Sequence, residues 1–247
     1  MTFDPLSYKP ASNLLDNRII MVTGAGDGIG AEAARTFARH GATVVLVGRT
    51  QKKLEAVYDA IIDDGSPEPT IAVIDFAKAQ GAEYQAIADA LNEQFGRLDG
   101  LLHNAAIVGY LAPLEHYEVS KWLEVMHVNL TAPYILTQTL LPLLKVSSDP
   151  AIVLTSSGVG RKGRALWGAY AVSKFGTEGF MQVIADELDS IRVNCINPGK
   201  TRTAMRRAAY PGEDPTTLKT AADIMPTYLY LLGPDSAGVT GASLDCQ

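Results

Sequence analysis

The stretch that decides the fold is residues 19–30, which read IIMVTGAGDGIG. Its apolar first part predicts a buried strand, and the glycines after it let the backbone turn sharply and come close to a bound group. The alanine-rich run that follows predicts a helix, whose first N–H groups and positive dipole end would point at the turn. This order of strand, glycine turn and helix predicts a phosphate-binding turn, with a tight structural turn as the alternative.

Strand and helix patterns alternate along the rest of the chain. Apolar strands that alternate with helices predict a parallel sheet covered on both faces. The predicted fold class is therefore α/β, a Rossmann-type doubly wound sheet of about seven strands with ligand sites at the carboxyl ends of the strands. The expected strands are 18–23, 43–48, 70–75, 98–103, 151–156, 192–196 and 242–246, and the expected helices are 28–40, 51–64, 79–95, 119–145, 167–190 and 221–232.

The organisation around these elements is simple. Residues 1–17, which include Pro5 and Pro10, predict an extended N-terminal arm, and residues 18–247 a single domain. Pro133 and Pro142 predict a bend or a break in the long helix at 119–145. The stretch 198–215 is rich in Pro, Gly and Arg and predicts a loop.

Composition excludes several kinds of partner. The chain has 247 residues, of which 47% are hydrophobic, and a net charge of −6, so no basic surface for nucleic acid or an anionic membrane is expected. Two cysteines, Cys195 and Cys246, predict a reducing compartment. We see neither a signal-peptide pattern nor a membrane span, and therefore expect a cytoplasmic protein. The four histidines lack metal-ligand spacing, so no metal is expected.

Read by spacing, residues 23–30 are Thr-Gly-x-x-x-Gly-Ile-Gly. This pattern resembles the phosphate turn of the short-chain dehydrogenase/reductase family. The resemblance implies that Gly24, Gly28 and Gly30 hold the pyrophosphate of a nicotinamide dinucleotide and that Ile29 borders its nicotinamide half.

The cofactor preference depends on the end of the second strand. Arg49 stands there without a carboxylate, and its guanidinium suits the 2′-phosphate of NADP, although a solvated arginine is the alternative. Asp27 points the other way, because NADP-preferring relatives often carry a basic residue at that place. We predict NADP(H) as the preferred cofactor, with NAD(H) as the alternative. Asp75 resembles the family residue near the adenine; an Asp that caps a turn is the alternative.

Two later segments also resemble the family. Residues 104–106, Asn-Ala-Ala, are similar to its Asn-Ala-Gly motif, which implies that Asn104 lies in the wall beneath the cofactor. Residues 197–199, Asn-Pro-Gly, are similar to the turn beside the nicotinamide carboxamide. The resemblance adds Pro198, Gly199, Thr201 and Thr203 to the cofactor-binding candidates.

The candidate catalytic group begins with Tyr170 and Lys174, which are four residues apart and share one face of a predicted helix. A nearby ammonium lowers the pKa of a phenol, so Tyr170 could act as a general acid or base. Ser157 lies 13 positions earlier, the family's spacing, and is predicted to donate to a developing oxyanion, with Ser156 as the neighbouring alternative. Asn129 matches the family asparagine that supports a relay water; a buried structural amide is the alternative.

These motifs occur in family order over nearly the whole chain, and the stretches 155–170 and 197–206 resemble the bacterial YciK-like oxidoreductases. The resemblance implies an enzyme that interconverts a small-molecule carbonyl and alcohol, with Lys174 also anchoring the ribose, and a homodimer or homotetramer. The alternatives are a dinucleotide-binding sensor and a structural subunit without turnover. Cations near the expected site mouth raise the hypothesis of an anionic substrate, or of an acyl group on an acidic carrier. A solvated rim or a subunit contact is the alternative. These cations are Arg161, Lys162, Arg164, Arg202, Arg206 and Arg207.

Overall fold

A computed structural model of the chain describes residue 4 and residues 7–247. These residues form a seven-stranded parallel sheet of order β3-β2-β1-β4-β5-β6-β7, which confirms the predicted fold class. The order reverses direction beside β1, between β1 and β4, where a doubly wound sheet places its ligand site. The strands are β1 (Ile19–Thr23), β2 (Thr43–Gly48), β3 (Thr70–Val73), β4 (Gly100–His103), β5 (Ala151–Thr155), β6 (Arg192–Asn197) and β7 (Ser243–Asp245).

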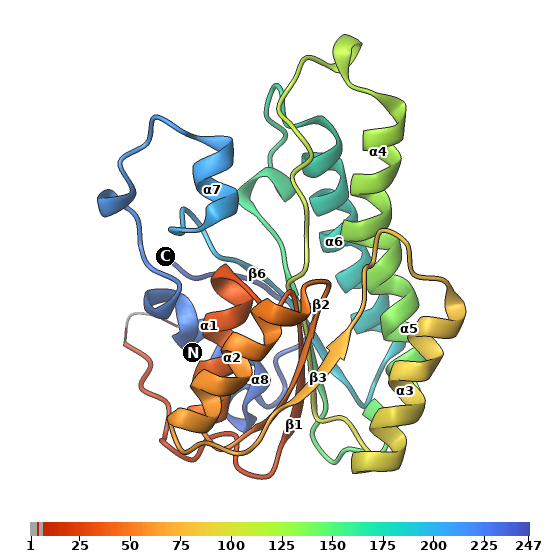
Figure 1. Cartoon of the computed structure of the whole chain (residues 1–247), viewed down its shortest axis with the longest axis vertical. Helices are drawn as coiled ribbons and strands as arrows, with labels where there is room; N and C mark the ends of the chain where they lie inside the picture. The colour runs from red at the N-terminus through yellow and green to blue at the C-terminus, as the bar shows by residue number, and fades with distance from the viewer. Residues whose placement is uncertain (1–3, 5–6) are drawn as a thin grey trace.

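Helices cover both faces of the sheet (Figure 1). One core cluster joins a face of the sheet to α1 (Gly28–Arg39), α2 (Gln51–Asp63) and α8 (Met225–Leu232). The other cluster joins the opposite face to α3 (Gly81–Phe95), α5 (Ala132–Leu144) and α6 (Gly168–Glu187). Because both faces are buried, the central strands are apolar at nearly every position, as the sequence predicted.

The long helix expected at 119–145 is interrupted. It consists of α4 (Val119–Met126), a π-helical turn at His127–Thr131 and then α5. Pro133 has no N–H to donate to the carbonyl of Asn129 four residues earlier, and its ring crowds that carbonyl. The predicted break is therefore confirmed near Pro133, whereas Pro142 lies inside α5.

Two other segments differ from expectation. The predicted loop at 198–215 contains a short helix, α7 (Ala204–Ala209), whose first turn is capped by Thr203 Oγ1 accepting from the Arg206 N–H at 3.0 Å. The described part of residues 1–17 has neither helix nor strand, as expected, but it folds as turns rather than as an extended arm. Leu15 in this segment is fully buried, and Tyr8 packs edge-on against Tyr230. Pro5 lies outside the described residues.

Within the described residues, none of the helices has the length and apolar character needed to cross a membrane.

Candidate active site

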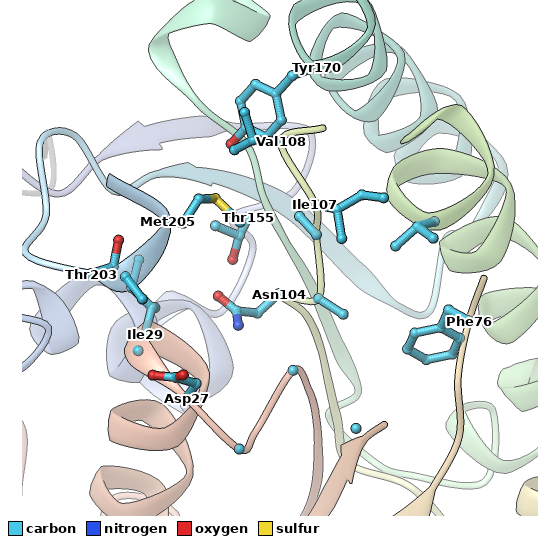
Figure 2. A pocket seen from close by; sticks show the side chains of 18 of the residues that line it. Asp27, Ile29, Phe76, Asn104, Ile107, Val108, Thr155, Tyr170, Thr203 and Met205 are labelled. Carbon is cyan, nitrogen blue, oxygen red and sulfur yellow. The ribbon is translucent and has the colours of Figure 1, made fainter. Parts of the chain in front are cut away.

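A cavity of about 490 Å³ opens at the carboxyl ends of the strands, between the glycine turn after β1 and the segments that carry Tyr170 and α7. Figure 2 shows Asp27 and Ile29 at one end of this cavity and Tyr170 at the other, with the phenol oxygen directed away from α6 into the open space. The size suits a small organic ligand or cofactor. Of the predicted site residues, the following line it: Gly24, Asp27, Gly28, Ile29, Arg49, Asp75, Asn104, Ser157, Tyr170, Lys174, Pro198, Gly199, Thr201 and Thr203.

The glycine turn is closed too tightly for side chains. Gly24 and Gly28 have φ angles of 68° and 54°, which glycine adopts without strain. A Cβ on Gly30 would lie 2.2 Å from the carbonyl oxygen of Gly24, so this position also requires glycine, although it does not line the cavity. Helix α1 begins at Gly28 without a side-chain cap, and its N–H groups face the turn.

Thr23 fixes the wall beneath the turn. Its Oγ1 accepts from the backbone N–H groups of Asn104 and Ala105, at 2.9 and 3.0 Å, and donates to the carbonyl of Leu102. The Asn104 amide donates back to the Thr23 carbonyl at 3.3 Å. Thr23 thereby joins the ends of β1 and β4, a role that our reading of the sequence did not assign to it.

At the outer end of the cavity, Arg49 is joined by a second cation. Lys53, on the first turn of α2, lines the cavity with Arg49, and its Nζ lies 2.5 Å from Asp27 Oδ2. The hydrogen bond from Lys53 lowers the pKa of Asp27. Asp75 accepts from the Ala77 N–H at 3.1 Å. It therefore caps a turn, which was the alternative interpretation of this residue. Our sequence analysis missed Lys53.

Tyr170 and Lys174 project from adjacent turns of α6, and both are almost fully buried. Lys174 Nζ donates to the Thr155 carbonyl at 2.7 Å and lies 5.7 Å from the centre of the Tyr170 ring. Its pKa is lowered to about 8 because burial disfavours the ammonium. Thr155, the last residue of β5, therefore sets the position of the Lys174 amine.

The predicted effect of Lys174 on Tyr170 is wrong for this structure. Burial raises the pKa of Tyr170 to about 12, and a hydrogen bond from the Ser157 hydroxyl acts more weakly in the lowering direction. The desolvation of the phenol dominates over any nearby charge. Tyr170 is therefore a protonated phenol at neutral pH, and Ser157 is the polar group that faces it.

Asn129 does not reach the main cavity. Its Oδ1 accepts from the Ile107 N–H at 2.8 Å, and its Nδ2 donates to the Ile107 carbonyl at 2.9 Å and to Ser173 Oγ at 3.0 Å. The side chain is thus the buried structural amide that stood as the alternative. A second cavity of about 10 Å³, near the volume that one water needs, is lined by residues that include Asn129, Thr155 and Lys174.

Only Arg206, among the six cations expected at the site mouth, lines the main cavity in the described structure. Its guanidinium donates to both carboxylate oxygens of Glu213 at 2.6 Å. Arg161 contacts Glu178 and Asp245 instead, and Arg164 donates to the Tyr210 hydroxyl. The second cationic segment therefore borders the cavity through Arg206, whereas none of Arg161, Lys162 and Arg164 lines it. The expectation is wrong for the first segment, where Arg161 and Arg164 turn toward other partners.

The fold and the cavity define an α/β protein with a nucleotide-sized site at the switch point of a parallel sheet. Comparison with known proteins gives the family: residues 18–214 match the model of the short chain dehydrogenases. The chain is 51% identical to "Uncharacterized oxidoreductase YciK" of Escherichia coli K12 over 98% of its length and 96% of that protein. The chain belongs to the short-chain dehydrogenase/reductase family and is an oxidoreductase of that family.

Two solved structures are similar over nearly the whole chain. A short chain dehydrogenase from Escherichia coli CFT073, complexed with NADPH, is 52% identical with a TM-score of 0.95, and the match covers 96% of this chain and 100% of that one. One from Shigella flexneri 2a, complexed with NADP, is 51% identical with a TM-score of 0.94 and the same coverage.

Proposed function

We propose that this oxidoreductase uses NADP(H) to interconvert a carbonyl compound and an alcohol, with Tyr170 as the general acid and base. The observation that carries the proposal is the convergence of Tyr170, Ser157 and Lys174 at one end of a single cavity. The glycine turn, Arg49 and Lys53 lie at its other end. Residues 18–247 would then act as one dinucleotide-binding and catalytic domain.

The residues of the cavity fit a nicotinamide dinucleotide. Gly24 and Gly30 approach each other closely and carry no side chains, so the backbone of the turn is accessible to a pyrophosphate. The first N–H groups of α1 point toward the same place. Pro198, Gly199, Thr201, Thr203 and Asn104 also line the cavity. By the family resemblance, the first four would border the nicotinamide, and Asn104 would lie in the wall beneath the cofactor. When bound, the nicotinamide supplies or accepts the hydride.

The preference for NADP(H) rests on charge. Arg49 and Lys53 both face the outer end of the cavity, where the adenosine 2′-phosphate would lie, and the only carboxylate on the glycine turn, that of Asp27, is already paired with Lys53. Two cations suit a dianionic phosphate, whereas the 2′-hydroxyl of NAD offers them no negative charge. The NADP and NADPH complexes of the two similar structures support this choice.

The proton is held at the Tyr170 hydroxyl. Because the pKa of the phenol is raised to about 12, Tyr170 keeps its proton at neutral pH and can donate it to a carbonyl oxygen as the alcohol forms. Ser157 would donate a hydrogen bond to the same oxygen and so stabilise the developing negative charge. By the family resemblance, Lys174 would hold the ribose hydroxyls.

A route for returning the proton runs behind Lys174. Since Pro133 offers no N–H to the Asn129 carbonyl, that oxygen lacks its α-helical donor. Asn129, the residue that carries this carbonyl, lines the water-sized cavity together with Lys174. We assign the relay role of Asn129 to this backbone carbonyl rather than to its amide, which is fully engaged with Ile107 and Ser173.

The test is a panel of ketones and aldehydes incubated with the protein and NADPH, with NADPH consumption followed by absorbance. Tyr170→Phe is the control, because it removes the proton donor and keeps the ring. We expect turnover of part of the panel by the native chain, and a loss of at least a hundredfold in Tyr170→Phe with NADPH binding retained. Tight NADPH binding without a single turnover on any carbonyl would favour a sensor or a structural subunit.

We also propose a homo-oligomer built on α4, α5 and α6. These helices expose large apolar side chains that a monomer leaves in water, namely Val119, Leu123, Tyr134, Val172, Phe175 and Val183. Sedimentation of the native chain at micromolar concentration should give a dimer or tetramer, and a monomer there would contradict the proposal. We place the enzyme in the cytoplasm, since Cys195 and Cys246 are both free thiols.

A further inference from the structure

The charged side chains around the catalytic end of the cavity are paired within the chain. Arg206 is held on both oxygens of Glu213, and its guanidinium also stacks on the Tyr210 ring at 3.8 Å from the centroid. Glu124, the other charged residue on the rim, forms an ion pair with Lys121. Lys174 lies beneath Tyr170 with its amine on the Thr155 carbonyl. Arg206 and Glu124 are thus neutralised by ion pairs within the chain, and the Lys174 amine is directed to the Thr155 carbonyl.

The remaining surface at this end is apolar and partly aromatic. Val108, Trp167, Met205 and Ala209 line it, and Figure 2 shows Val108 and Met205 at the same end of the cavity as Tyr170. Their side chains offer area for packing but no ionic or directional contact. A substrate that enters here meets a hydrophobic surface before it reaches the hydroxyls of Tyr170 and Ser157.

Trp167 is held in place by two neighbouring aromatic rings. Its ring lies 5.5 Å from that of Tyr170 and 5.9 Å from that of Tyr210, centroid to centroid. Leu166, directly before it, has a φ angle of 73°, a conformation that a branched residue rarely adopts. The Leu166 carbonyl accepts from the Ala112 N–H at 3.2 Å, which fixes this backbone. Strain of this kind persists only where the surroundings require the geometry.

We propose that the substrate is an uncharged carbonyl compound with a flat apolar body, which packs against Trp167 and Met205 while its carbonyl oxygen reaches Tyr170 and Ser157. This inference rests on the proposed function and names its substrate class. In the reduction, the carbonyl carbon gains a hydride from NADPH, and the π electron pair of the carbonyl becomes the bond to the proton that Tyr170 gives. The products are the alcohol and NADP, and a proton from solvent restores Tyr170.

An anionic substrate is disfavoured by the pairing of Arg206. Glu213 already neutralises this guanidinium by accepting from its Nε and from one Nη. A substrate carboxylate at Arg206 would therefore place a second negative charge beside Glu213. The sequence suggested an anionic substrate because of six cations, and Arg206, the one of these six that lines the cavity in the described structure, is already paired.

The experiment compares matched ketones with NADPH: acetophenone, methyl 4-acetylbenzoate and 4-acetylbenzoate. We expect kcat/KM for the two neutral ketones to exceed that for the carboxylate by tenfold or more. Glu213→Gln should raise kcat/KM for 4-acetylbenzoate at least threefold relative to the methyl ester, because it releases Arg206. Glu93→Gln, on the exposed surface of α3, should leave this ratio as it is.

Trp167→Ala supplies a second readout. It should raise KM for acetophenone about tenfold or more, while the dissociation constant of NADPH, measured by fluorescence, stays within twofold. A native preference for 4-acetylbenzoate would overturn the substrate class and leave the proposed function intact. If NADPH binds and no carbonyl of the wider panel is reduced, the proposed function itself fails.

Discussion

Lys53 Nζ lies 2.5 Å from Asp27 Oδ2, so an ion pair joins the first turn of α2 to the glycine turn at the outer end of the cavity. Both side chains are more than half exposed. In the open solvent such a pair is weak, and a more highly charged partner can replace it. Asp27 therefore holds Lys53 at the cavity that Arg49 also lines, and the positive charge of Lys53 offsets the negative charge of Asp27.

The first prediction concerns this lysine. Lys53→Ala should weaken NADPH binding about tenfold, or about 1.4 kcal/mol, because one of two cations for the 2′-phosphate is lost. NADH binding should change less than twofold. The measurement is fluorescence titration of both cofactors, with Arg49→Ala as a companion that should show the same selective loss.

Lys52→Ala is the matched control, since this neighbouring lysine does not line the cavity. It should leave both dissociation constants unchanged. Equal losses for NADPH and NADH in Lys53→Ala, or no loss at all, would remove Lys53 from the phosphate site.

The second prediction concerns the closure of the glycine turn. Gly30→Ala would place a methyl group 2.2 Å from the Gly24 carbonyl oxygen and 2.6 Å from Asn104 Nδ2, so the turn has to shift. We expect a loss of about 1–3 kcal/mol in the free energy of unfolding and a fall in NADPH affinity of more than tenfold. Urea denaturation and fluorescence titration measure the two effects.

Gly81→Ala provides the comparison. Gly81 is the first residue of α3, and, apart from its sequence neighbours and the backbone of its own helix, no heavy atom lies within 4 Å of the position that its new methyl group would take. The stability of this variant should stay within about 0.5 kcal/mol of the native chain. Native NADPH affinity in Gly30→Ala would show that the turn does not bind the cofactor.

The sheet was predictable because both faces of each central strand are buried. The strand at 43–48 was predicted with the bounds that β2 has, and the helix at 28–40 ends one residue later than α1. Periodicity does not encode the π-helical turn at His127–Thr131 or the six-residue helix α7. Pro133 marks where the helix is interrupted, but the contact of Asn129 with Ile107 joins residues 22 positions apart, which periodicity cannot show.

The candidate site was predictable only where a motif fixes it. The glycine turn and the pair Tyr170 and Lys174 could be located by spacing. Lys53 was missed because its contact with the cavity depends on the rotation of α2 about its axis. The direction of the Tyr170 pKa was wrong because spacing shows that two groups share a helix face and does not show how deeply both are buried.

The third prediction uses the buried amine of Lys174. Its pKa is about 8 in the folded chain and about 10.5 when unfolded, so the unfolded state binds more protons between these values. Stability attributable to Lys174 is thus present above pH 10.5 and is lost as pH falls through 8. Between pH 7 and pH 9, the free energy of unfolding should rise by about 1 kcal/mol more in the native chain than in Lys174→Met.

The difference between the two chains removes the contributions of all other titrating groups. Urea denaturation at pH 7, 8 and 9 supplies the measurement. Parallel curves for the native chain and Lys174→Met would mean that the folded-state pKa of Lys174 is not lowered.

The fourth prediction separates the side chain of Asn129 from its backbone. Asn129→Ala leaves the N–H and the carbonyl of Ile107 without their partner, which should cost about 2 kcal/mol of the free energy of unfolding. The backbone carbonyl at position 129 remains in the variant, so proton relay should persist. We expect a raised KM from the displaced segment around Ile107 and a pH profile of kcat close to the native one.

Asn92→Ala, on the exposed surface of α3, should change neither stability nor kinetics. The opposite pattern for Asn129→Ala, with native stability but a kcat that falls and changes its dependence on pH, would assign the chemistry to the amide. The two patterns differ because a buried amide that holds a loop acts on stability and KM, whereas a group that moves protons acts on kcat.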